Sequence, residues 1–402
     1  MYVHGIRRLF AFEGYIISKI TMSSELVQVN LRRDKRFRLA CPACGATMGA
    51  SRTKLQTARD LPLGTALMVL LVYDAIQGHC SACGAWATIR PAGIDDRARA
   101  SRRLMEFVSC LARHLPLSHV KEIVPVDDAT AFRWDKAILQ RNLPEPKLDD
   151  LRILLIDEKA VRKRHGYVTL VMNGQNGELL HMAEGKKKES LQSFFDKLSD
   201  EQKKGIVAVG MDRAGAYYEV VKEQLPQADI VFDKFHLIAN YNEVIDKVRR
   251  AEWHKASEQD KGVIKGQRYN LFRNPENRSK PQTRSLYRLL AINESIMRVY
   301  VLKDALRELW TYEYRGWAEK YFDKWVGWAK DSAVEALQAF ARSLVKARDE
   351  VLNYCKHKIT TGPLEAFNNT ISRIIHRACG IRNMDYLFLK LRQESLETDL
   401  PK

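Results

Sequence analysis

Three short apolar runs that each end in an aspartate constrain the fold of this 402-residue chain most strongly. They are Ile153–Asp157, Ile206–Asp212 and Ile230–Asp233, and helical stretches lie between them. Buried strands that alternate with helices predict a mixed sheet with parallel members. Because the carboxyl ends of such strands meet at one edge of the sheet, we expect Asp157 and Asp212 to lie close together.

Two more strands and a late helix complete the predicted core. Tyr167–Met172 and Leu179–Met182 flank a turn rich in Asn and Gly, a pattern that predicts a hairpin. From Leu237 to about Cys355 no strand pattern is present, and the composition predicts an all-helical insertion. The last core helix is expected from Pro363 to about Ala378.

Glu365, in the first turn of that last helix, is the third candidate metal ligand. It shares a polar helix face with Asn368 and Asn369, beside an apolar stripe. Carboxylate oxygens suit Mg²⁺, and two such ions can clamp the attacking and leaving oxygens of a phosphodiester. Structural roles stay open: aspartates are common in strand-end turns, and an early glutamate complements the helix dipole.

Further polar residues lie around these carboxylates. Asp233 and His236 follow a strand and can support the metal ligands or move protons, although a helix-capping Asp with a surface His is equally consistent. Arg373 and Arg377, further along the helix of Glu365, are suited to the DNA backbone.

Four of the seven cysteines form two CxxC pairs, each followed by glycine. A two-residue spacer lets both sulfurs of a pair face one point, so Cys41, Cys44, Cys80 and Cys83 predict one structural Zn²⁺ in a zinc ribbon. His79 is a possible substitute ligand. The alternatives are buried cysteines paired by chance or a redox dithiol.

After the ribbon, the pattern predicts three short helices with the spacing of a helix-turn-helix. The third, Asp128 to Arg141, follows a turn at Pro125–Asp127. It would present four residues to DNA: Thr130, Arg133, Lys136 and Arg141. A small helical bundle with a solvated basic face fits the same pattern.

A net charge of +17 makes a polyanion the first partner to expect, and double-stranded DNA is favoured over a membrane surface. The longest apolar run, around Ala66–Tyr73, is too short to span a bilayer, and Met1–Ile20 lacks the pattern of a signal peptide. The expected location is the bacterial cytoplasm, in association with the nucleoid.

Several stretches resemble one known family, the DDE transposases of the bacterial insertion-sequence L-three (ISL-three) group. They are Ile156–Thr169, Ala208–Asp212 with Ala216 and Tyr217, Ile230–His236, Thr361–Asn369 and Gly380–Asn383. The resemblance implies a ribonuclease H-like core interrupted before its last helix, terminal inverted repeats as the bound DNA, and Asp157, Asp212 and Glu365 as ligands of two Mg²⁺ (or Mn²⁺) ions. Arg213 departs from the family, where a small or apolar residue is more usual.

The predicted fold class is therefore multidomain: a zinc ribbon and helix-turn-helix, then an α/β ribonuclease H-like core with an all-helical insertion before its last helix. The expected parts are an extension (1–26), the zinc ribbon (27–96), the helix-turn-helix (97–143), a linker (144–150), the core (151–252 and 356–392) and the insertion (253–355).

The predicted activity is metal-dependent DNA cleavage and strand transfer, by a homo-oligomer of two or more chains because two DNA ends must be paired. Two alternatives remain at this point. One is a non-catalytic DNA-binding regulator derived from such an enzyme, and the other is a nuclease of the same fold that hydrolyses DNA without joining it.

Overall fold

The structure is a computed structural model that describes residues 10, 12–63, 67–162, 166–213 and 215–397. Residues 1–9 and 11 of the predicted N-terminal extension lie outside this part. The chain folds as two compact units, of which the first combines residues 1–144 with 373–394. The second combines residues 145–372 with 395–402. The two units divide at Pro144, where the sequence predicts a linker.

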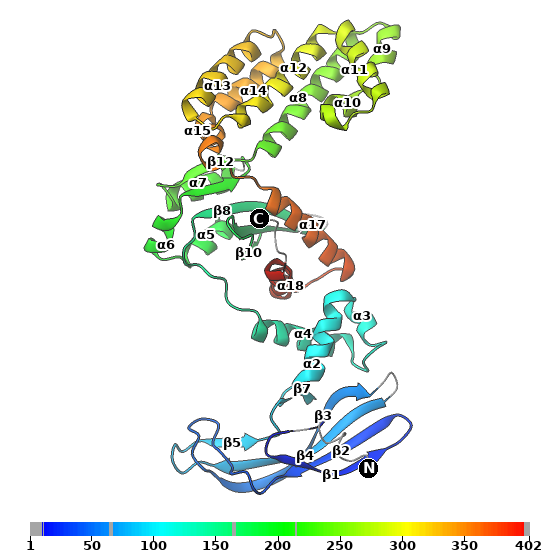
Figure 1. The fold of residues 1–402 in the computed structure, drawn as a ribbon, viewed down its shortest axis with the longest axis vertical. Helices are drawn as coiled ribbons and strands as arrows, with labels where there is room; N and C mark the ends of the chain where they lie inside the picture. Colours follow the sequence, from blue (N-terminus) through cyan, green and yellow to red (C-terminus); the bar gives the residue numbers. More distant parts are fainter. Residues whose placement is uncertain (1–9, 11, 64–66, 163–165, 214, 398–402) are drawn as a thin grey trace. The chain divides into compact units, whose positions relative to one another are not determined.

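The first unit begins with a seven-stranded sheet of order β1-β2-β4-β3-β7-β6, with β5 paired to β4 (Figure 1). Its strands are β1 (Tyr15–Met22), β2 (Leu26–Arg33), β3 (Gly49–Leu63), β4 (Leu67–His79), β5 (Trp86–Ile89), β6 (Ile94–Asp95) and β7 (Ala100–Ser101). Val27, Val29 and Leu31 alternate along β2 and are buried, as expected for a strand with one covered face. The sequence assigned no structure to residues 15–22, which pair with β2 along its length.

Helices α2 (Arg102–His114), α3 (Leu117–Val120) and α4 (Asp128–Asn142) follow the sheet. The Asp127 side chain caps α4 by accepting a hydrogen bond from the Thr130 amide at 2.8 Å, a contact typically worth ~1 kcal/mol. Trp134, Ala131 and Ile138 of α4 pack with α2 in one apolar cluster. The sequence pattern predicts the middle helix over Ser118–Val124, whereas the observed α3 ends at Val120.

The first unit also contains α18 (Met384–Glu397) as far as Glu394, although the sequence placed residues 356–392 in the core. Its anchor is Asp135 of α4, whose side chain is completely buried. This carboxylate accepts hydrogen bonds from Ser109 and Tyr386 and pairs with Lys390 at 3.0 Å. Burial lowers the pKa of Lys390, and the charge of Asp135 opposes that shift. A buried carboxylate needs such partners, so α18 completes the core of the helical region.

The second unit is built on a five-stranded sheet of order β10-β9-β8-β11-β12. Its strands are β8 (Ile153–Arg162), β9 (Gly166–Asn173), β10 (Leu179–Glu184), β11 (Ala208–Met211) and β12 (Asp229–Phe232). Pairing is antiparallel from β8 to β10 and parallel among β8, β11 and β12. The helices between these strands are α5 (Lys188–Phe195), α6 (Asp200–Gly205) and α7 (Gly215–Gln224). The α/β class predicted from the alternating pattern is confirmed.

The sequence pattern predicted Asp157 at the end of its strand. In the structure, Asp157 lies within β8. β11 pairs with β8 only as far as Ile156, whereas β9 pairs with it as far as Arg162. The apolar run therefore ends where the parallel neighbour stops, and the strand continues as one arm of a hairpin.

Described residues 234–357 are entirely helical or irregular, as the sequence predicts. α8 (Lys234–Lys255) starts directly after β12 and runs into this insertion (Figure 1). The other elements are α9 (Glu258–Ile264), α10 (Arg268–Phe272), η1 (Pro275–Asn277), α11 (Lys280–Ile292), α12 (Glu294–Glu308), η2 (Leu309–Thr311), α13 (Arg315–Lys330), α14 (Glu335–Val345), α15 (Arg348–Leu352) and α16 (Tyr354–His357). The chain then enters α17 (Gly362–Arg377). None of the described helices combines the length and apolar character that crossing a bilayer requires.

The buried Asp135–Lys390 pair yields a stability prediction. Lys390→Met removes the cation and leaves Asp135 charged in an apolar interior, which should cost about 3–5 kcal/mol. We expect faster hydrogen exchange in peptides from α2 and α4, measured by mass spectrometry on the full chain. Lys136→Met is the control, because Lys136 pairs at 3.5 Å with the exposed Asp385 and such pairs contribute at most ~1 kcal/mol. Equal exchange in both variants would contradict the anchoring role of Lys390.

Candidate active site

The strand register of the second unit places three aspartates in a row. Met211 of β11 pairs with Ile156 of β8 on one side and with Phe232 of β12 on the other. The next residues along the three strands are Asp157, Asp212 and Asp233. Neighbouring strands lie ~4.8 Å apart, so these residues occupy adjacent positions at one edge of the sheet.

Helix α17 brings two more polar residues to this edge. The Asn368 amide donates a 2.7 Å hydrogen bond to Oδ2 of Asp157. The possible ligand atoms of Glu365, Asp233 and His236 lie within 4.8 Å of one another. Glu365 and Asn368 are three residues apart and therefore share a helix face. The structure thus brings together most residues of the predicted site, whereas Asn369 is exposed one position further along α17.

Burial and mutual repulsion govern the charges at this edge. Burial raises the pKa of Asp157, the Asn368 and Glu158 hydrogen bonds lower it, and the charge of Asp212 raises it further. Burial also raises the pKa of Glu158, against the charge of Lys186. Clustered carboxylates in a partly dry site favour either protonation or a bound cation.

One buried atom of Asn368 favours a bound cation over protonation of the carboxylates. Oδ1 of Asn368 is buried and has no hydrogen-bond partner among the described residues. A buried acceptor without a partner costs free energy unless a water, an ion or a ligand contacts it. Oxygen-rich side chains and this acceptor together fit a hydrated divalent cation such as Mg²⁺.

Asp233 fixes the position at which α17 begins. Its Oδ1 caps α8 by accepting from the Phe235 amide at 3.2 Å, and its Oδ2 accepts from the Thr361 hydroxyl at 2.5 Å. Thr361 stands immediately before α17, so this contact fixes the helix that carries Glu365. His236 lies nearby, with its Nε2 3.9 Å from Asp233 Oδ2. The capping and supporting roles considered for Asp233 are therefore compatible.

Three neighbours of this site were not among the predicted site residues. Thr361 is one, and its place before a Gly-Pro helix start was the available signal. Glu158 follows Asp157 on β8, and burial together with the charges of Asp212 and Asp157 raises its pKa. Tyr217 is buried and hydrogen-bonded to Thr169 at 2.6 Å; burial and these carboxylates raise its pKa to about 12.

Arg213 joins the sheet edge that carries the aspartates to the insertion. Its guanidinium donates to the backbone oxygen of Ser343 in α14 at 3.0 Å and lies over the Phe232 ring. Tyr218 of α7 donates to Glu350 of α15 at 2.7 Å. The unusual residue after Asp212 therefore docks the insertion on the core.

The predicted DNA-contacting residues of α4 differ in accessibility. Thr130 is buried, and its hydroxyl takes part in the cap with Asp127. Lys136 donates to Asn383 at 3.2 Å, and Arg141 lies 3.8 Å from Asp95. Arg133 and Arg141 are both exposed, and Arg133 donates to the Ala129 backbone oxygen at 3.3 Å and to the Thr130 hydroxyl at 3.0 Å. On α17, Arg373 is exposed and Arg377 lies 3.8 Å from Glu394.

The four cysteines converge in the first unit because the register pairs Gly49, at the start of β3, with His79, at the end of β4. Each CxxC pair forms a turn closed by a glycine amide, Gly45 to Cys41 and Gly84 to Cys80, at 2.8 Å. Both glycines have φ of +73°, a conformation that other residues rarely adopt.

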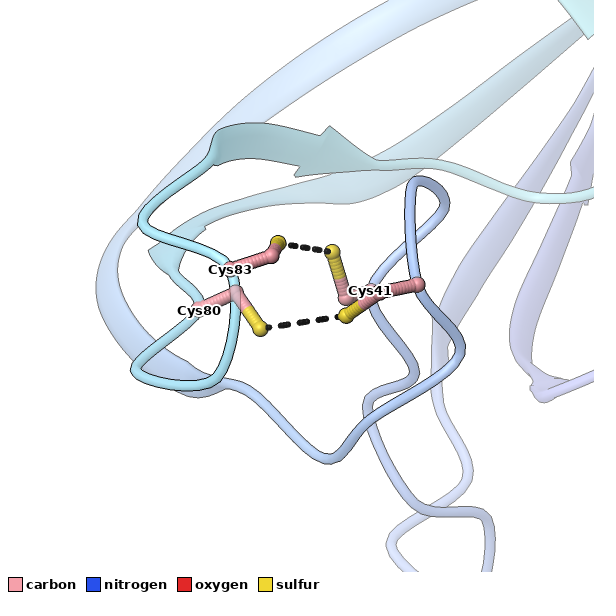
Figure 2. A group of neighbouring side chains, drawn as sticks. Cys41, Cys80 and Cys83 are labelled. Carbon is pink, nitrogen blue, oxygen red and sulfur yellow. Dashed lines mark hydrogen bonds between the residues drawn. The ribbon is translucent and has the colours of Figure 1, made fainter.

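Sulfur–sulfur distances are 3.7 Å for Cys41–Cys83 and 3.6 Å for Cys44–Cys80 (Figure 2). A tetrahedral site with bonds of ~2.3 Å has edges of about 3.8 Å, so this spacing fits Zn²⁺. Backbone amides of Cys44 and Ala43 lower the pKa of Cys41 to about 7, which favours the thiolate. The cluster indicates a zinc site with no free coordination position.

A sheet with an antiparallel hairpin, a parallel half and carboxylates at its edge defines a ribonuclease H-like phosphoryl-transfer core. The model of the ISL3-type DDE transposase family, described as "Transposase", matches residues 154–391. This chain therefore belongs to the ISL3 family of DDE transposases, which are phosphoryl-transfer enzymes. The resemblance found in the sequence is confirmed.

Two kinds of curated relative support this membership. The transposase for insertion sequence element IS1001 from Bordetella parapertussis is 32% identical over 391 residues, which cover 96% of each chain. The transposase for insertion sequence element IS1557 from Mycobacterium tuberculosis is 27% identical over 257 residues, which cover 58% of each chain.

The sulfur geometry predicts the effect of removing one thiolate. We expect the wild-type protein to hold one zinc per chain and Cys83→Ser to lose most of it, because three ligands leave the tetrahedron open. Inductively coupled plasma mass spectrometry on purified protein measures the metal. Cys110→Ser, at an exposed cysteine of α2, is the control and should keep its zinc. Full zinc in Cys83→Ser would disprove the four-cysteine site.

Proposed function

We propose that this chain binds the terminal inverted repeats of an insertion sequence and catalyses metal-dependent DNA cleavage followed by strand transfer. The observation that carries the proposal is the row of carboxylates at the parallel edge of the sheet, completed by Glu365 and Asn368 from α17. A non-catalytic regulator would have no need to keep repelling carboxylates together in a partly buried site.

Asp157, Asp212 and Glu365 would hold two Mg²⁺ or Mn²⁺ ions. When bound, these ions supply Lewis-acid activation of the attacking oxygen and stabilise the leaving oxygen. Asn368 holds Oδ2 of Asp157 through its amide and keeps Oδ1 available as an acceptor. Asp233 fixes the start of α17 through Thr361, and His236 supports the same edge.

In this proposal, water cuts the DNA at an element end and the freed 3′-hydroxyl attacks target DNA in the same site. Each step forms one phosphorus–oxygen bond and breaks another, so no covalent enzyme intermediate is needed. The phosphorus stays a diester in the joining step, and the leaving 3′-oxygen takes a proton.

The first unit would choose the DNA. The zinc ribbon and the helix-turn-helix would supply a positively charged surface, and both Arg133 and Arg141 are exposed on α4. Lys136, Arg141, Arg373 and Arg377 would contact phosphates, and Thr130 would act by capping α4. We further propose that two or more chains assemble, because both element ends must be held during transfer.

Replacing one proposed metal ligand tests the active site. Asp212→Asn keeps the size of the side chain but removes its charge, so we expect cleavage and joining to fall on the order of 10³-fold with DNA binding unchanged. The substrate is a duplex made from the repeats that flank the coding region, and gels separate nicked from joined products. Asp200→Asn, at an exposed carboxylate of α6, should remain active. Full activity of Asp212→Asn would refute the assignment.

The Asn368–Asp157 hydrogen bond predicts a pH dependence. Asn368→Ala removes a contact that lowers the pKa of Asp157, so this pKa rises further above its usual value. Metal binding needs the ionised carboxylate, and the acid limb of the cleavage rate should move to higher pH. Rates measured across pH at constant Mg²⁺ test this. The exposed Asn369→Ala is the matched control; an equal loss in the Asn368 variant at every pH would contradict the mechanism.

A further inference from the structure

One face of α13 in the insertion carries aromatic rings and lysines in alternation. We call Trp317, Lys320, Tyr321, Lys324 and Trp328 the aromatic–lysine face. At 100° per residue, these five positions fall within about 100° of the helix circumference. From Trp317 to Trp328 the face extends over about 16 Å at 1.5 Å per residue.

Apart from Tyr321, whose hydroxyl donates to the Ala305 backbone oxygen of α12 at 2.7 Å, this face does not pack the helix against its neighbours. The other side of α13 buries Ala318, Phe322, Trp325 and Val326, and the Trp325 indole donates to the Leu302 backbone at 2.9 Å. In contrast, Trp317 is 62% exposed and Trp328 is 40% exposed. Two large rings in solvent cost hydrophobic free energy in the isolated chain, so they indicate a binding surface.

Each lysine of this face lies over one of the two exposed tryptophan rings. Lys320 Nζ lies 4.9 Å from the Trp317 ring centre, and Lys324 Nζ lies 5.0 Å from that of Trp328. Neither lysine makes an ion pair with any residue in the described part of the chain. Tyr321 continues the row, with its ring centre 6.3 Å from that of Trp328.

Two acidic residues of α13 lie outside the aromatic–lysine face and form ion pairs with arginines. Glu319 pairs with Arg315 at 2.9 Å and with Arg348 at 3.6 Å. Asp323 pairs with Arg348 at 3.1 Å. The aromatic–lysine face therefore has cations that are available to a polyanion and rings that are available to flat apolar groups.

We propose that the aromatic–lysine face binds unpaired nucleotides of single-stranded DNA. Bases stack on the exposed rings, and the two lysines contact the phosphates between them. Duplex DNA hides its base faces, and a purely apolar protein partner would leave two ammonium groups without solvation. The inference rests on the proposed function and deepens it, because cleavage creates a DNA end at which terminal base pairs can fray and expose unpaired nucleotides.

Binding of a short fluorescein-labelled oligothymidylate to the full chain, followed by anisotropy without Mg²⁺, tests the proposal. Because stacked bases lose their contacts when the rings are removed, Trp317→Ala with Trp328→Ala should weaken binding by about tenfold or more. The corresponding double Phe variant should retain most of the affinity. Lys320→Ala with Lys324→Ala should flatten the salt dependence of binding.

Tyr269→Ala with Tyr287→Ala is the matched control, since these tyrosines are 67% and 66% exposed elsewhere in the insertion. This variant should bind oligothymidylate as the wild type does, and circular dichroism checks that each variant folds. Unchanged binding by the double Trp→Ala variant would overturn the proposal. An equal loss of duplex binding, or a change of oligomeric state in sedimentation that accompanies the loss, would also overturn it.

The outcome is separable from that of the proposed function. Anisotropy requires no catalysis, and Asp212→Asn should bind the oligonucleotide with wild-type affinity. If the wild-type protein neither cleaved nor joined DNA but bound oligothymidylate through Trp317 and Trp328, the proposed strand transfer would be refuted. The binding proposal would remain valid.

Discussion

Parallel pairing of β8 with β11 and of β11 with β12 sets the geometry on which the enzyme depends. It brings Ile156, Met211 and Phe232 into one register, so the residues that follow them lie side by side. A slip of one position in any of these pairings would turn an aspartate to the other face of the sheet. The buried apolar side chains of the strands therefore hold together carboxylates that repel one another.

Short sequence patterns predicted those parts of the arrangement that depend on residues close together in the chain. An apolar run that ends in Asp indicates a buried strand with a polar end, and two CxxC pairs indicate four thiolates around one metal. The helix that carries Glu365 also followed from its Gly-Pro start and apolar stripe. These local patterns carry no information on which elements pack against one another. The largest differences between the predicted and the observed structure arise from such long-range contacts.

Three of those differences have clear physical causes. Asp157 lies within a strand because β9 continues where β11 stops. Thr361 and Asp233 are 128 positions apart in the chain, and only the folded topology joins them. The pairing of Lys390 with Asp135 likewise spans most of the protein, so no sequence window could place α18 against α4.

That last contact has a consequence for how the protein is made. Translation runs from the amino terminus, so the ribosome synthesises Asp135 long before Tyr386 and Lys390. Until α18 emerges, α4 has a carboxylate with no cation to accompany it into the interior, and the helical region lacks part of its core. A product interrupted before α18 would therefore lack both partners that α18 gives to Asp135, and its helical region would fold less stably than that of the complete chain.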